Sequence, residues 1–225
     1  METVIDYEKE LNSHIEQERA AVRLSSITGE LLYHQGIELV FFRNHLNDVT
    51  VAEVLKLHTY SKKVVNKPVD IFTSVLLAKE ILNLNLAPAK LDIGKLSSEW
   101  LSEKEDFSSP TEFLKNKLSG FELENAVAPE PRDVVLYGFG RIGRLAAREL
   151  IKQAGKGQQL RLRGIVTRSN SESDLIKRAA LLKNDSVHGA FDGTVAVDSE
   201  KEALIINGQI VKMICGKKPE DIDYT

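Results

Sequence analysis

The sequence predicts an α/β fold for the C-terminal part of the chain and a mainly helical (α+β) region before it. Short apolar runs alternate with amphipathic segments from residue 133 onward, whereas helical periodicity and capping patterns dominate residues 1–126. Between these parts, Pro129 and Pro131 disfavour a continuing helix. We therefore expect a helical N-terminal extension at 1–126, a linker at 127–132 and an α/β domain at 133–225.

The composition is that of an ordinary globular protein, with 42% hydrophobic and 28% charged residues. A formal net charge of −3, without long runs of one sign, gives no indication of binding to nucleic acid or to an anionic membrane. The single cysteine, Cys215, excludes an intrachain disulfide. The first residues lack the pattern of a signal peptide, and the apolar stretches are too short to span a bilayer. We expect a cytoplasmic protein.

The N-terminal region begins with a predicted helix. Ile5, Leu11, Ile15 and Val22 lie on roughly one helical face, with glutamate and arginine elsewhere, which is the pattern of an amphipathic helix. The next apolar stretch, residues 31–42, is interrupted by Gln35-Gly36, which indicates a short hairpin.

Two capping boxes predict further helices in this region. Thr50 to Glu53 opens a helix through Val64, and Ser109 to Glu112 opens one to about Leu118, with a proline at its first position. Residues 68–84 are a further predicted helix, and residues 90–93 a strand.

The C-terminal region alternates predicted strands and helices. The apolar run at 133–137 ends in a glycine-rich turn, which is typical of a buried parallel strand. Asn207-Gly208, between two apolar runs, strongly indicates a hairpin. The remaining elements are predicted helices at 144–153 and 174–183, a strand at 160–167, and short β segments at 191–195, 203–206 and 209–214.

The turn after the first of these strands has the spacing Gly138-x-Gly140-x-x-Gly143 and is followed by a helix and a strand. In that context it is the fingerprint of a Rossmann-type NAD(P)-binding domain. Gly138 permits the tight turn, Gly140 lets a pyrophosphate approach the backbone, and Gly143 lets the helix pack on the strand. The helix N-terminus presents free N–H groups to the phosphates. The alternative is a glycine turn that happens to begin a helix.

Four ordered segments resemble the glyceraldehyde-3-phosphate dehydrogenases. They are Gly-Phe-Gly-Arg-Ile-Gly-Arg at 138–144, Asn-Asp-Ser-Val-His-Gly-Ala-Phe at 184–191, Leu-Ile-Ile-Asn-Gly at 204–208 and Pro-Glu-Asp-Ile-Asp-Tyr at 219–224. Residues 1–130 match nothing in the ordinary-length enzymes and resemble the N-terminal extension of a longer bacterial form. We expect this extension to be an oligomerisation or packing module, or else a regulatory or partner-docking domain.

The resemblance implies that the loop Gly138, Phe139, Gly140, Arg141, Ile142 and Gly143 holds the cofactor pyrophosphate, with Arg141 and Ile142 in contact with it. Lys217 best matches a basic residue near the adenine, although a solvated turn lysine is equally consistent. NAD-specific members carry an aspartate at the end of the second strand. Here Arg168 stands there with Ser169, which could bind a 2′-phosphate. The expected cofactor is NAD or NADP, and Arg168 predicts that NADP is tolerated or even preferred. The alternative is that Arg168 is only an exposed loop arginine.

The implied reaction of the whole enzyme is the phosphorylating oxidation of glyceraldehyde 3-phosphate to 1,3-bisphosphoglycerate in glycolysis or gluconeogenesis. A cysteine thiolate, within a Ser-Cys-Thr-Thr-Asn motif, attacks the aldehyde in this family. That motif is missing, and Cys215 has the context of a strand end, so we assign no catalytic residue. The implied partners are a phosphorylated aldehyde, phosphate and further copies of the chain, because the family forms tetramers.

From these features we expect the chain to be an N-terminal fragment of a longer protein and to be inactive by itself. One alternative is a non-catalytic nucleotide-binding module that docks a partner, and another is an erythrose-4-phosphate dehydrogenase. Asp185, Ser186 and His188 are not read as a hydrolytic triad, because the members of a triad normally come from distant parts of the chain. We expect them to form turns and packing contacts.

Overall fold

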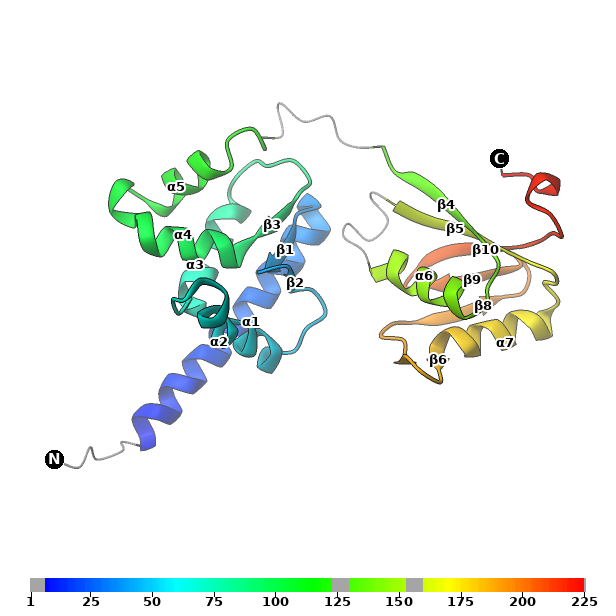
Figure 1. Cartoon of the computed structure of the whole chain (residues 1–225), viewed down its shortest axis with the longest axis horizontal. Coiled ribbons are helices and arrows are strands. Elements are labelled where there is room, and N and C mark those ends of the chain that lie inside the picture. Colours follow the sequence, from blue (N-terminus) through cyan, green and yellow to red (C-terminus); the bar gives the residue numbers. More distant parts are fainter. Residues whose placement is uncertain (1–6, 123–129, 153–159, 225) are drawn as a thin grey trace. The chain divides into compact units, whose positions relative to one another are not determined.

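The computed structural model describes residues 7–122, 130–152 and 160–224. The chain divides into two compact units, Met1–Ala128 and Pro129–Thr225 (Figure 1). Of the expected linker, residues 127–132, the first three lie outside the described residues and the last, Arg132, is already part of a strand. Each unit has its own hydrophobic core, so each is described separately.

The N-terminal unit packs helices around a small sheet with the strand order β2-β1-β3. Its core includes the fully buried side chains of Leu31, Phe41, Leu77 and Phe113. The elements are α1 (Tyr7–Gln35), β1 (Glu38–Phe41), β2 (Asn44–His45), α2 (Val51–Val65), α3 (Ile71–Leu82), β3 (Lys90–Asp92), α4 (Ile93–Glu103), the 3₁₀ helix η1 (Lys104–Asp106) and α5 (Pro110–Lys117).

Polar caps begin four of these helices. Thr50 forms the expected capping box with Glu53 at the start of α2. Ser109 caps α5 by accepting a hydrogen bond from the Glu112 backbone, but the Glu112 carboxylate bonds to Ser108. Aspartates that the sequence analysis did not single out as caps, Asp70 and Asp92, cap α3 and α4. Side-chain oxygens thus satisfy the first free N–H groups of each helix.

Two expectations for the first 45 residues were wrong. Residues 31–35 are the last turn of α1 and not a hairpin strand, because Leu31 and Leu32 continue the buried face of that helix. The hairpin lies later, between β1 and β2. The predicted apolar face of α1 is also not the buried one, since Leu11, Ile15 and Val22 are 43%, 39% and 57% exposed. Ile5 lies outside the described residues.

The C-terminal unit is an α/β layer, and its sheet confirms the Rossmann-type fold class. The strand order is β4-β5-β10-β9-β8. The pairs β4–β5 and β5–β10 are parallel, and the pairs β10–β9 and β9–β8 are antiparallel. The elements of the sheet layer are β4 (Arg132–Tyr137), α6 (Arg141–Lys152), β5 (Leu160–Thr167), α7 (Glu172–Lys183), β8 (Val195–Asp198), β9 (Ala203–Ile206) and β10 (Gln209–Cys215). A two-stranded ladder of β6 (Asn184–Asp185) and β7 (Gly189–Ala190) and the 3₁₀ helix η4 (Pro219–Asp221) complete the unit.

Two details of this unit differ from expectation. Strand β4 lies at one edge of the described sheet, and its Val134, Val135 and Leu136 are only half-buried, whereas a fully buried strand was predicted. The segment 191–194 is a turn, and the strand that follows it begins at Val195. In both units, none of the described helices is long and apolar enough to cross a membrane.

Candidate cofactor-binding site

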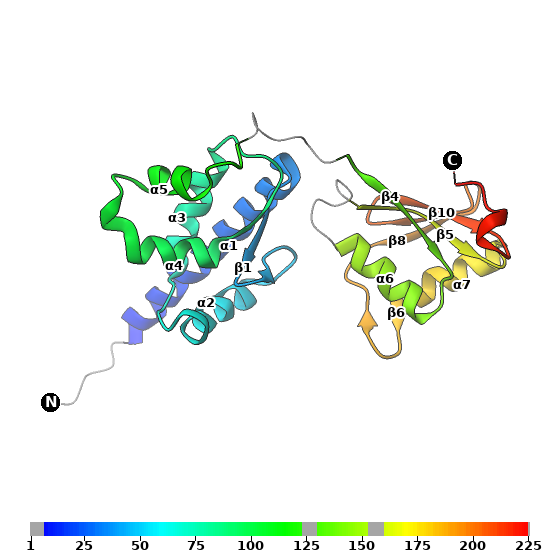
Figure 2. The same ribbon diagram turned by 45° about the horizontal axis from the view of Figure 1, so that its top comes forward.

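The sheet brings three predicted site segments together at one end, where its parallel strands finish. Strands β4, β5 and β10 are parallel and end at Tyr137, Thr167 and Cys215, so the residues after each strand lie at the same end of the sheet (Figure 2). Ligands of open α/β sheets bind at such carboxyl ends. The glycine loop, Arg168 and Lys217, which are far apart in the sequence, follow these three strand ends.

Hydrogen bonds tie the three strand ends together. The Gly138 N–H donates to the Val166 carbonyl at 2.9 Å, and the Gly216 N–H donates to the Thr167 carbonyl at 3.0 Å. The Tyr137 hydroxyl donates to the Lys217 carbonyl at 2.6 Å. The backbone that carries the predicted site is therefore held in place by the sheet itself.

The geometry of the glycine loop explains its glycines. Gly138 has φ +97°, a conformation that other residues rarely adopt. A Cβ at Gly143 would lie 2.3 Å from the Gly138 carbonyl oxygen, so a side chain there would push α6 away from the loop. A Cβ at Gly140 would meet nothing within 4 Å, which leaves open space over the backbone at that point.

The residues between the glycines divide into two groups. Phe139 is buried in the core of the unit, so only its backbone is available to a ligand. Arg141 and Ile142 are exposed at the start of α6, and Ile142 is 83% exposed despite its apolar side chain. The prediction that Arg141 and Ile142 face a cofactor is compatible with these positions.

A buried carboxylate fastens the segment 184–191 to α6. The Asp185 carboxylate accepts backbone hydrogen bonds from Val187 and His188, both at 3.0 Å, and lies 3.4 Å from the Arg144 guanidinium. These N–H donors hold the pKa of Asp185 well below its usual range. Arg148, itself buried, donates to the Leu182 carbonyl at 2.6 Å.

These contacts give Asp185 the turn-forming role expected of it. Arg144 also donates to the Phe139 carbonyl at 3.3 Å, so Asp185 and the glycine loop share one arginine. The sequence analysis missed Arg144 as a support of the loop and Arg148 as a support of segment 184–191. The only signal in the sequence was their spacing of four residues, which places two arginines on the same side of one helix.

A positive and a negative side chain, Arg168 and Asp174, lie near the end of β5. Arg168 is exposed, and its carbonyl lies 3.4 Å from the Cys215 thiol, which donates to it. The Ser169 hydroxyl donates to Asp174 at 2.5 Å, and the Ser171 hydroxyl donates to the same carboxylate at 2.8 Å. Both hydroxyls lower the pKa of Asp174. The sequence analysis overlooked this carboxylate, because Asp174 lies in the first turn of α7 and reaches back to the strand end.

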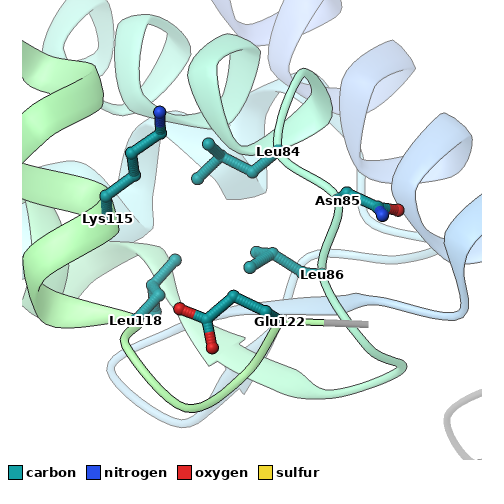
Figure 3. Close-up of a pocket in the computed structure, with 6 residues that line it drawn as sticks. All are labelled: Leu84, Asn85, Leu86, Lys115, Leu118 and Glu122. Carbon is teal, nitrogen blue, oxygen red and sulfur yellow. The ribbon is translucent and has the colours of Figure 1, made fainter. Parts of the chain in front are cut away.

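The N-terminal unit contains a separate pocket of about 270 Å³. Three leucines, Leu84, Leu86 and Leu118, form its apolar walls, with Asn85, Lys115 and Glu122 around them (Figure 3). None of the predicted site residues lines it. Across the residues that the structure describes, no group of three or more potential metal ligands occurs.

The part of the chain that contains the glycine loop matches a known protein family. Residues 132–225 match the family "Glyceraldehyde 3-phosphate dehydrogenase, NAD binding domain". A "Glyceraldehyde-3-phosphate dehydrogenase-like protein" of Pseudomonas aeruginosa is 37% identical over 202 residues, which cover 88% of this chain and 44% of that protein. The glyceraldehyde-3-phosphate dehydrogenases of Streptococcus dysgalactiae and Streptococcus pyogenes are both 41% identical over 91 residues, 40% of this chain and 24% of theirs.

The chain thus spans less than half the length of the curated relatives that it matches. The similarity to the Pseudomonas protein extends well beyond residues 132–225 and includes much of the N-terminal unit. The streptococcal similarities cover a length close to that of the C-terminal unit alone.

Proposed function

We propose that the C-terminal unit, whose residues 132–225 match the family of glyceraldehyde-3-phosphate dehydrogenase NAD-binding domains, binds the pyrophosphate of NAD or NADP at Gly138–Gly143. The observation that carries the proposal is the open backbone at Gly140 directly before α6. The first N–H groups of a helix have no intrahelical partner, and the helix dipole favours an anion beside them. Arg141 adds a positive charge at the same helix end.

The remaining proposed contacts lie along the carboxyl ends of the parallel strands. Ile142 offers an apolar surface, Lys217 lies beside the adenine, and Arg168 lies beside the adenosine ribose. The bound nicotinamide would accept a hydride from the substrate. In this chain, Asp185 and Arg144 would hold the loop in the shape that the pyrophosphate requires.

For the whole protein, we propose an oxidoreductase that converts glyceraldehyde 3-phosphate and phosphate into 1,3-bisphosphoglycerate in the cytoplasm, as a homo-oligomer. Cys215 is not the proposed nucleophile, because its thiol donates to the Arg168 carbonyl at the end of a strand. A Cys215→Ser variant of the whole protein should therefore keep its activity within about twofold. A complete loss of aldehyde oxidation would show that this assignment is wrong.

Cofactor binding to this chain is tested by calorimetry with NAD, NADP and ADP-ribose. A Gly140→Leu variant should bind at least about tenfold more weakly, because its side chain occupies the open space without meeting protein atoms. An Ile176→Leu variant, changed on an exposed position of α7, is the matched control and should bind as the unmodified chain does. Equal affinity of the Gly140→Leu variant would contradict the proposed site.

A further inference from the structure

Tyr137 joins two strand ends that are not neighbours in the sheet. It is the last residue of β4, and its hydroxyl donates at 2.6 Å to the carbonyl of Lys217, which follows the end of β10. Strand β5 lies between β4 and β10, and neighbouring strands are about 4.8 Å apart. The Tyr137 side chain therefore passes across the carboxyl end of β5, where Val166 is its partner in the β4–β5 ladder.

The core of the unit does not use this ring. Leu136, the preceding residue, packs against the core that residues of α6 and α7 form on one face of the sheet (Figure 1). Successive side chains of a strand point to opposite faces, so Tyr137 lies on the other face. It is 52% exposed, which leaves part of the ring open to a ligand.

The ring is held at both of its ends. Its backbone belongs to β4, and the next residue, Gly138, donates a 2.9 Å hydrogen bond to the Val166 carbonyl. Its hydroxyl is held by the Lys217 carbonyl. A ring that is fixed in this way needs little further ordering when a flat ligand packs on it, so its open part is preorganised.

The charges around the ring indicate the kind of ligand. Arg168 and Lys217, which follow the ends of β5 and β10, are both exposed, and neither side chain has a partner among the described residues. Burying two unpaired positive charges under an apolar protein segment is costly, whereas they attract phosphate groups. An aromatic face between unpaired cations therefore favours a nucleotide, which has both a flat base and phosphates.

We propose that the adenine of a bound dinucleotide stacks on the Tyr137 ring. The inference rests on the proposed function, which places the pyrophosphate at Gly138–Gly143 and Lys217 beside the adenine. Tyr137 connects these two places, because the glycine loop follows it in the chain and its hydroxyl contacts Lys217. Stacking uses the face of the base and needs no hydrogen bond to its edge. Tyr137 thus holds the base, while the glycine loop holds the phosphates.

Calorimetry of the full chain with ADP and with inorganic pyrophosphate separates the base from the phosphates. Tyr137→Leu keeps an apolar side chain but removes the ring. It should bind ADP about tenfold more weakly and pyrophosphate within about twofold of the unmodified chain. Tyr137→Phe keeps the ring and should bind ADP within about threefold of the unmodified chain.

Tyr224→Leu is the matched control. Tyr224 is also an exposed tyrosine of the C-terminal unit, and its hydroxyl also donates to a backbone carbonyl, that of Pro219. This hydrogen bond stays within residues 219–224 and does not cross the strand ends. The control should bind ADP as the unmodified chain does.

Fluorescence of etheno-ADP, a fluorescent analogue of ADP, reports the stacking itself, because an aromatic ring stacked on its base quenches the emission. The emission should fall when the analogue binds to the unmodified chain or to Tyr137→Phe. It should not fall when Tyr137→Leu is saturated with the analogue.

Unchanged ADP affinity in Tyr137→Leu overturns the inference. An equal loss of ADP and pyrophosphate affinity also overturns it, because Tyr137 would then only support the loop. The same holds for an equally impaired Tyr224→Leu control, or for ADP analogue binding to the unmodified chain without quenching.

The proposed function is tested separately by Gly140→Leu, which should weaken the binding of pyrophosphate and ADP alike. If Gly140→Leu weakens ADP binding and Tyr137→Leu does not, the pyrophosphate site stands and only the stacking is wrong. A chain that binds neither compound at millimolar concentration overturns both proposals.

Discussion

Single residues in the N-terminal unit connect its stability to pH. His58 is buried, and its Nδ1–H donates to the Val54 carbonyl at 2.8 Å, so Nε2 is the acceptor for the Ser74 hydroxyl at 3.0 Å. Ser74 in turn lies 3.2 Å from Ser97. This chain of polar groups joins α2, α3 and α4 and requires the neutral imidazole.

Burial lowers the pKa of His58, and this outweighs the opposing effect of the Val54 hydrogen bond. Between the folded pKa and the unfolded value of 6.5, the unfolded chain binds more protons than the folded chain. The N-terminal unit should therefore lose stability as the pH falls below about 6.5, by about 1.4 kcal/mol for each unit of pKa depression. Urea unfolding followed by Trp100 fluorescence between pH 7.5 and 5.5 measures this loss.

The control is a His58→Gln variant, which lacks the titrating group. It should be less stable than the unmodified chain at pH 7.5 and should lose less stability on acidification. If both proteins show the same pH dependence, His58 does not control it.

Cofactor choice is also a matter of single side chains. We expect NADP to be accepted, because Arg168 is exposed at the end of β5 and can pair with a 2′-phosphate. Arg168→Ala should lower the affinity for NADP relative to NAD by about tenfold. Asp174→Asn should raise the affinity for NADP, because it removes a negative charge beside Ser169. Calorimetry with both cofactors measures these ratios.

Arg163→Ala is the matched control for Arg168→Ala. Arg163 is an exposed arginine of the same strand that pairs with Asp133 and not with the strand end, so its loss should leave the ratio unchanged. NADP binding at least tenfold weaker than NAD binding in the unmodified protein would rule out the expected acceptance of NADP.

At the level of elements, the capping box of α2 has a measurable contribution. Thr50→Ala removes the acceptor for the Glu53 N–H and the donor to the Glu53 carboxylate. The N-terminal unit should lose about 1 kcal/mol of stability, measured by urea unfolding with Trp100 fluorescence. Thr59→Ala is the control, because the Thr59 hydroxyl only donates to the Leu55 carbonyl within the same helix. A loss as large in the control would show that the cap is not the cause.

Local signals predicted many of the elements. Capping residues, the Asn207-Gly208 turn and the glycine loop act through neighbouring backbone groups, so their patterns are readable in the sequence. Helix α4 was not predicted, because its start depends on Asp92, a residue that also accepts a hydrogen bond from the distant Phe42 N–H. The end of α1 was misplaced because its last turn is as apolar as a strand.

For the whole molecule, two separate cores predict two separable unfolding transitions. Leu204 is fully buried in the C-terminal core and Leu77 in the N-terminal core. Each leucine-to-alanine change should cost about 2–5 kcal/mol in its own unit. Trp100, which packs against Phe113, should report only the Leu77→Ala change. A Leu204→Ala variant that shifts the Trp100 transition equally would show that the units unfold together.

The sequence by itself determined the fold class of residues 133–225, the glycine loop and the family resemblance, because these depend on short spacings along the chain. Only the tertiary structure decided which side of α1 is buried, since Leu11 and Leu24 are equally apolar and periodicity cannot tell one apolar side from another. It also decided that Asp185 and Arg144 share the support of the loop and that Asp174 returns to the end of β5. Such contacts join different elements, and local patterns in the sequence do not show which elements lie close together in space.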